Sequence, residues 1–253
     1  MFSLAECAPR LAAAGARVRV LNCFTRTEHA PYRAPEDDRA AGTLRASEDR
    51  AAAALLGVVE VVDLDFEDAP GRLGVGVDQV CDPALPVDDA LADALAAAMA
   101  ADLARAHAVP SHDPSVPHAA PDAWLAAPLA PPGAHVDHRA AHAAARRLAA
   151  AGLRVVWYED LPYATRVAAA EVAASAGGVA RTLGTALVSL ALACADGGRR
   201  KRAAVACYAS QIEAGALDAL ADALDVSGER RGYAERLWVP LAASSGWMRA
   251  LGA

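Results

Sequence analysis

Apolar runs with strand character alternate with segments of helical spacing along the first 160 residues or so. Residues 17–24 (RVRVLNCF) and 58–66 (VVEVVDLDF) are rich in β-branched side chains, which favour strands. Shorter apolar runs predict two more strands, within 123–130 and 153–160. Between the strands, helical spacing and glycine stops predict helices over 3–14, 44–56, 88–107 and from about 136 onward. The alternation predicts an α/β fold with a Rossmann-like, mostly parallel sheet covered by helices on both faces.

The remainder of the chain is expected to be mainly helical. Its longest apolar run, Leu183 to Ala195, is too short to span a bilayer and is interpreted as a buried helix. We find no linker and no internal repeat, so we expect one domain over residues 1–253. A parallel α/β domain usually opens with a strand, whereas this chain opens in a helix. We therefore expect the first strand to be missing.

Composition narrows the class of protein. The net charge is −7 with a pI of about 5.5 and no basic stripe, which argues against a nucleic-acid partner. Five dispersed cysteines without a C-x-x-C pair are typical of reduced thiols, so we expect a cytoplasmic protein. No signal peptide and no membrane span are expected.

The sharpest candidate for chemistry is the run His135-Val136-Asp137-His138, which follows the turn Pro131-Pro132-Gly133 at the end of a predicted strand. Ligands of open α/β sheets bind beyond the carboxyl ends of strands. Two imidazoles three positions apart at a helix start can face the same way, and neutral imidazole is a common zinc ligand. Alone, the same pattern also fits a solvated helix start in which Asp137 favours the helix dipole.

Other motifs give weaker evidence of a functional site. His142 is interpreted as a helix-face residue, and His107, His112 and His118 fall in or beside a Pro/His-rich connection. We expect the loop 109–122 of that connection to set substrate specificity, as long loops at strand ends often do. The chain has no G-x-S-x-G, no G-x-G-x-x-G and no P-loop, so serine hydrolysis, dinucleotide binding and NTP binding are unsupported.

Several stretches, in order, resemble the PIG-L/LmbE-like zinc-dependent N-deacetylases, which remove acetyl groups from N-acetylated amino sugars. The resemblance covers roughly residues 1–240. It rests on LRASEDRAAAALLG, VVDLDFEDAPGR, GAHVDHRAAHAAARRL, VVWYEDLPYA and KRAAVACYASQ. It implies an LmbE-like fold and hydrolysis of the acetamide of a small N-acetylated sugar or glycoconjugate.

The resemblance also implies roles for single residues. His138 would be a zinc ligand, His135 would stabilise the oxyanion, and Asp137 would orient a histidine. At the mouth of the sugar site, the implied residues are Arg45, Glu48 and Asp68. For Arg45 and Glu48 the alternative is ordinary charge on a helix surface. For residues 158–160 we favour a turn that satisfies backbone donors.

One departure from the family pattern limits these implications. The family's first motif, H-x-D-D, supplies a His and an Asp to the zinc and an Asp as general base, and no counterpart occurs in this sequence. A catalytic zinc normally has three protein ligands plus water, so zinc binding is expected to be weak or absent. Two explanations compete: a truncated version of an ordinary enzyme, which we favour, or a catalytically inactive carbohydrate-binding relative.

Overall fold

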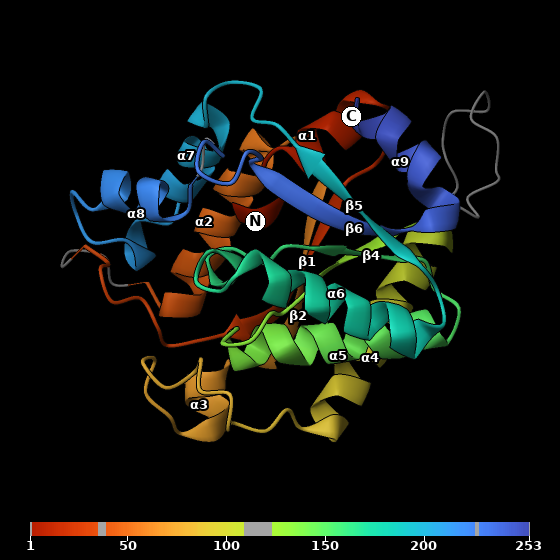
Figure 1. Ribbon diagram of the computed structural model, residues 1–253. Helices are drawn as coiled ribbons and strands as arrows, with labels where there is room; N and C mark the ends of the chain where they lie inside the picture. The colour runs from red at the N-terminus through yellow and green to blue at the C-terminus, as the bar shows by residue number, and fades with distance from the viewer. Residues whose placement is uncertain (1, 35–38, 109–122, 226–227, 253) are drawn as a thin grey trace.

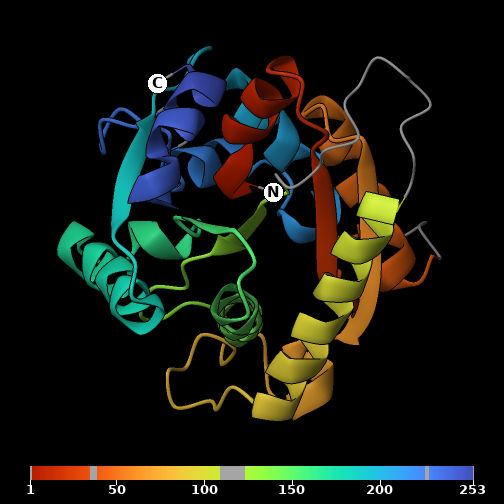
Figure 2. The same cartoon turned by 90° about the vertical axis from the view of Figure 1, so that its right-hand side faces the viewer.

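The strands form two separate sheets. The computed structural model describes residues 2–34, 39–108, 123–225 and 228–252. In the first sheet, β1 (Arg19–Arg26) pairs in parallel with β2 (Glu60–Glu67). The second sheet has the order β3-β4-β6-β5, with no backbone pairing to the first among the described residues. Figure 2 shows β1 and β2 on the right of the view and the second sheet on the left.

The second sheet mixes strand directions. β3 (Leu125–Pro128) is parallel to β4 (Val155–Tyr158), whereas β6 (Glu235–Pro240) is antiparallel to both of its neighbours, β4 and β5 (Leu187–Leu192). The helices are α1 (Cys7–Ala13), α2 (Ala41–Leu55), α3 (Ala69–Leu73), α4 (Asp89–Ala108), α5 (Val136–Ala150), α6 (Ala169–Leu183), α7 (Arg199–Ala206), α8 (Leu217–Ala223) and α9 (Ser244–Leu251). Short 3-10 turns are η1 (Phe2–Leu4), η2 (Tyr163–Thr165), η3 (Ala209–Gln211) and η4 (Leu241–Ala243).

Helices hold the two sheets together from opposite faces (Figure 1). On one face, apolar residues of α4 and α5 form a cluster that receives side chains from β1 and β2 and also Leu125 of β3. On the other face, α1 contributes to two clusters. Ala8 packs with Val18 and Leu56 beside the first sheet, while Cys7 packs with Val156 and Leu237 of the second. The helices therefore join what the strands leave separate.

The expectation of a mixed α/β fold with a parallel-rich sheet and helices on both faces is confirmed. The helix expected within Leu183 to Ala195 is wrong, because residues Leu187–Leu192 form β5. Periodicity alone does not separate a short buried strand from a buried helix. The missed signal is Gly184, which takes a left-handed conformation (φ 61°) and ends α6 at Leu183, ahead of the residues that form β5.

Within the described ranges, no helix is long and apolar enough to cross a membrane. The loop 109–122, expected to set specificity, lies outside the described residues.

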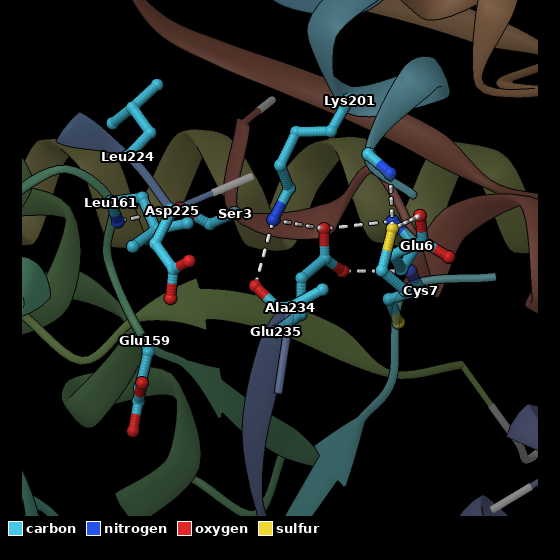
Figure 3. A network of polar contacts seen from close by, with 12 residues as sticks. Ser3, Glu6, Cys7, Glu159, Leu161, Lys201, Leu224, Asp225, Ala234 and Glu235 are labelled. Atoms are coloured by element: carbon cyan, nitrogen blue, oxygen red, sulfur yellow. Dashed lines mark hydrogen bonds and ion pairs between the residues drawn. The ribbon is translucent and has the colours of Figure 1, made fainter. Parts of the chain in front are cut away.

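A buried ion pair anchors the start of α1 (Figure 3). The carboxylate of Glu235, at the start of β6, accepts hydrogen bonds from the backbone amides of Glu6 (2.8 Å) and Cys7 (2.9 Å). Lys201 of α7 lies 3.2 Å from the same carboxylate and donates a hydrogen bond to the carbonyl of Ala234 (2.9 Å). Both charged side chains are fully buried. Each charge thus depends on the other for compensation.

Replacing Lys201 with methionine should lower the free energy of unfolding by about 3–5 kcal/mol, because the Glu235 carboxylate stays buried without its cation. Urea unfolding measures the change. The matched control is Arg199→Met on the exposed first turn of the same helix, expected to change stability by less than about 0.5 kcal/mol. Equal effects of the two substitutions would show that the buried pair does not anchor the fold.

Candidate functional site

A large cleft of about 2890 Å³ lies between the two sheets. We call it the inter-sheet cleft. Its walls come from β1, β3 and β4, and its mouth lies where the carboxyl ends of β1 to β4 meet the start of α5. Residues from this mouth include Thr27, His29, Arg45, Asp68, His135, Asp137, His138, Asp160, Tyr163, Tyr208 and Gln211. The cleft therefore sits where ligands of open α/β sheets bind.

His135 caps the amino end of α5. It follows a turn in which Gly133 has a positive φ of 76°, and its Nδ1 accepts a hydrogen bond from the backbone amide of Asp137 (3.1 Å). Because Nδ1 is an acceptor, the proton of the neutral ring resides on Nε2. Burial lowers the pKa of His135 to about 4, although the Asp137 carboxylate opposes this. Near neutral pH, His135 is thus an uncharged N–H donor.

His138, one turn later on α5, has the opposite hydrogen-bonding role. Its Nδ1 lies 2.7 Å from a carboxylate oxygen of Asp160 and donates to it, which leaves the lone pair on Nε2. Burial acts to lower the pKa of His138, but the charge and hydrogen bond of Asp160 outweigh it and raise the pKa above 6.5. The ring packs edge-on against Tyr163 at 5.2 Å and lies 5.7 Å from the ring of His135.

Asp160 is the residue that sequence reasoning missed. It was assigned to a backbone turn, yet its buried carboxylate fixes the orientation of His138. Its place just after the carboxyl end of β4 was the available signal.

Asp137 is bound by other partners. Its carboxylate pairs with Arg72 (2.8 Å) and accepts the backbone amide of Ala69 (2.9 Å). Its Oδ2 lies 3.8 Å from Nδ1 of His135. The carboxylate that hydrogen-bonds to a histidine in this site is therefore that of Asp160, and Asp137 joins α5 to α3.

The three residues expected to bind substrate lie in different settings. Arg45 and Asp68 line the inter-sheet cleft, and the Nε of Arg45 is buried without a hydrogen-bond partner among the residues that the structure describes. Asp68 also caps α3 by accepting the amide of Gly71. Glu48 is buried, and its two oxygens accept hydrogen bonds from the amide (2.7 Å) and hydroxyl (2.8 Å) of Ser210. Glu48 thus holds η3 in place through Ser210.

The wall opposite α5 carries polar groups that the sequence did not single out. Tyr208 donates a hydrogen bond to Asp49 (2.7 Å), and Gln211 donates one to the carbonyl of His29 (3.1 Å). Burial and the nearby Arg45 guanidinium lower the pKa of His29, so this ring is neutral at physiological pH. This wall offers hydroxyl, amide and imidazole groups beside the Asp49 carboxylate and the Arg45 guanidinium, a combination suited to a polyhydroxylated ligand.

His142 points away from this mouth. Its Nδ1 donates to the carbonyl of Pro128 (2.9 Å), and its ring packs against Trp157 at 4.9 Å. It is a supporting residue of α5 on the side of β3 and β4.

The described residues do not by themselves make a catalytic zinc centre. Such a centre needs three protein ligands, and His138 Nε2 is a suitable first one because a carboxylate holds its other nitrogen. No group of three His, Cys, Asp or Glu ligand atoms that includes His138 occurs in the described part of the chain. The group that does occur there, Glu6, Cys194 and Asp196, lies beside α7, where the amide of Gly198 donates to Cys194 and Asp196.

No protein-family model and no curated protein matches the chain. Solved structures do. A40926 pseudoaglycone deacetylase Dbv21 aligns over 94% of this chain and 90% of its own, with a TM-score of 0.64 and 20% identity. The zinc-inhibited form of teicoplanin deacetylase Orf2 aligns over 94% of this chain and 92% of its own, with a TM-score of 0.62 and 22% identity. A deacetylase–teicoplanin complex aligns over 94% of this chain and 92% of its own, with a TM-score of 0.60 and 24% identity.

The chain has the fold of these deacetylases. The resemblance noted in the sequence is thus met by structural neighbours that are deacetylases, while membership of the PIG-L/LmbE-like family stays a prediction.

Replacing Asp160 with asparagine should lower the pKa of His138 below its ordinary value of 6.5, because burial then acts without the opposing carboxylate. NMR titration of the imidazole protons measures this, with His29 as the internal control on the other wall. The raised pKa stabilises the folded protein below pH 6.5, and this contribution is lost as pH rises through the folded pKa. The stability difference between parent and variant should therefore shrink with rising pH. An unchanged His138 pKa would contradict the pairing.

Proposed function

We propose that this protein hydrolyses the acetamide of an N-acetylated amino sugar or sugar conjugate. The observation that carries the proposal is the pair of imidazoles with opposite roles, His135 and His138, at the mouth of the inter-sheet cleft. The fold shared with solved deacetylases supports the reaction class. In the reaction, a water oxygen adds to the acetamide carbon, the C–N bond breaks, and acetate and a free amine leave.

His135 suits the stabilisation of the tetrahedral intermediate. Its Nε2–H is available, and the ring stays neutral because burial keeps its pKa at about 4. An N–H donor aimed at the developing oxyanion stabilises its negative charge through a hydrogen bond. The cap on Nδ1 holds the ring in one orientation, so the donor is preorganised.

His138 is the proposed zinc ligand. Its hydrogen bond to Asp160 orients Nε2 toward the cleft and increases its basicity, as carboxylates do for metal-bound histidines. The other ligands of a catalytic zinc are not provided by the described residues, so weak zinc binding is expected of them. Arg45 and Asp68 are the proposed contacts to the sugar, because both line the cleft mouth.

The second candidate function is carbohydrate binding without catalysis. The observation that favours it is the missing three-ligand set around His138 in the described residues. The polar wall of Asp49, Tyr208 and Gln211 would serve a bound sugar in either case.

The activity is tested by acetate release from an N-acetylglucosamine conjugate, with zinc absent and added. We expect slow release, and a kcat/KM about 100- to 1000-fold lower for His135→Asn. Asparagine is a good N-cap, so it retains the cap of α5 while removing the Nε2–H. His142→Gln, one helical turn beyond His138 and facing Trp157, is the control and should keep the parental rate.

Two outcomes decide between the candidates. Equal rates for His135→Asn and the parent would refute the role of His135. Binding of the conjugate without acetate release, with or without zinc, would favour the carbohydrate-binding alternative.

Substitutions of Arg45 and Glu48 should affect different properties, substrate binding in the first case and stability in the second. Arg45→Met should raise KM for the conjugate about tenfold, because a charge-assisted hydrogen bond to substrate is lost while the apolar stem is retained. Glu48→Gln should instead lower the free energy of unfolding by about 1–3 kcal/mol with little change in KM, because the amide replaces one of the two acceptors for Ser210. A raised KM for Glu48→Gln with unchanged stability would reverse this assignment.

A further inference from the structure

A second group of ligand-type side chains lies outside the inter-sheet cleft. Glu6 stands directly before α1, whereas Cys194 and Asp196 follow the carboxyl end of β5. One ligand atom of each lies within 4.8 Å of the other two, and none of the three residues lines the cleft. The group joins two segments of the chain, since Glu6 and Cys194 are 188 positions apart in the sequence.

The carboxylate of Glu6 is buried with weak compensation for its charge. Its side chain has no solvent exposure, and the one backbone amide that donates to it, that of Ala195, is 3.4 Å away. Its ion-pair partner among the described residues is Arg10, at 3.7 Å. The guanidinium of Arg10 donates instead to the carbonyls of Ala193 (2.6 Å) and Leu251 (3.1 Å). Burial of a carboxylate is costly when its partners are this distant.

The buried ammonium group nearby is already used. Lys201 is fully buried and pairs with Glu235 at 3.2 Å. In Figure 3, Lys201 and Glu6 lie on opposite sides of the Glu235 carboxylate. Because Lys201 neutralises Glu235, the negative charge of Glu6 remains unbalanced within the described part of this interior, and a cation beside Glu6 would balance it.

Cys194 lies between two carboxylates. Its Sγ is 3.6 Å from an oxygen of Glu6 and 3.6 Å from an oxygen of Asp196. A thiol has one proton, so it can donate a full hydrogen bond to only one of these oxygens. The amide of Gly198 approaches the same sulfur to 2.7 Å, which suits a sulfur that acts as an acceptor.

These separations match the spacing of ligand atoms around a tetrahedral zinc ion. Zinc binds thiolate sulfur at about 2.3 Å and carboxylate oxygen at about 2.0–2.2 Å, which places the two ligand atoms about 3.5 Å apart. A thiolate among the ligands favours zinc over Mg²⁺ and Ca²⁺, which prefer oxygen ligands. Three protein ligands leave a fourth position for water, which the partial exposure of Cys194 and Asp196 admits.

We propose that Glu6, Cys194 and Asp196 bind a zinc ion, with water as the fourth ligand. On binding, the sulfur of Cys194 exchanges its proton for the metal, and the proton passes to solvent. The ion balances the buried charge of Glu6 and ties the start of α1 to the turn between β5 and α7. This site is independent of the proposed function, because none of its ligands lines the inter-sheet cleft.

The unmodified full chain provides the first test. Cys194 and Cys207 are both half-buried free thiols, so one molecule contains the test residue and its control. Zinc should slow the alkylation of Cys194 by iodoacetamide about tenfold or more, whereas Cys207 should react at the same rate with and without zinc. Mass spectrometry of the digested protein measures both rates. Equal rates at Cys194 with and without zinc would overturn the proposal.

Cadmium identifies the sulfur ligand, because cadmium–thiolate bonds absorb in the ultraviolet. The first equivalent of Cd²⁺ should produce this charge-transfer band in the parent chain. Cys194→Ser should abolish the band, and the matched control Cys207→Ser should retain it. A band that survives in Cys194→Ser would overturn the proposal. A band that is lost only in Cys81→Ser would place the metal at the inter-sheet cleft and would also overturn it.

Glu6→Gln separates the charge of the site from its shape. The amide oxygen still accepts from Ala195, but the negative charge is gone. Without metal, the variant should unfold at the parental temperature or above it, because no unbalanced charge is buried. Added zinc should raise the unfolding midpoint of the parent and leave that of the variant nearly unchanged. A lower midpoint without metal, together with a parental response to zinc, would overturn the proposal.

Discussion

The carboxylate of Glu235 binds the first amides of α1, and the arrangement of the two sheets depends on this contact. α1 packs against both sheets, so its position determines how the half containing β1 meets the half containing β4. An amide-bound carboxylate is a strong anchor, but burying it requires a compensating cation, which Lys201 supplies. A polar contact at one helix start thus fixes the apolar packing of two layers.

The candidate site places two differently hydrogen-bonded imidazoles on one turn of helix. His135 and His138 have the same chemistry in water, yet their neighbours give them different tautomers. The backbone amide of Asp137 donates a hydrogen bond to Nδ1 of His135, whereas Nδ1 of His138 donates one to the carboxylate of Asp160. The result is a neutral donor and a lone pair within 5.7 Å, measured between ring centres. Environment, rather than residue type, therefore sets the two roles.

The sequence predicted features whose cause is local. The strands β1 to β4 and the helices α2, α4 and α5 follow from apolar runs, helical spacing and glycine stops, and the placement of His135 and His138 follows from a turn after a strand. Features with distant partners were not predictable in this way. Asp160 reaches His138 across 22 positions, and Glu48 reaches Ser210 across 162. No spacing rule encodes such pairs, since tertiary packing brings them together.

Asp137 shows how the site and the divided sheet are connected. Because β1 and β3 share no backbone pairing in the described residues, the cleft mouth keeps its shape only through side chains and helices that cross between the halves. Asp137 is one of these links, since its buried carboxylate ties the start of α5 to Ala69 and Arg72 on the side of β2. It lies between the two imidazoles in sequence and also holds their helix against the other half. Its contribution to the site is therefore to fix the position of α5, and through it the direction in which both rings face.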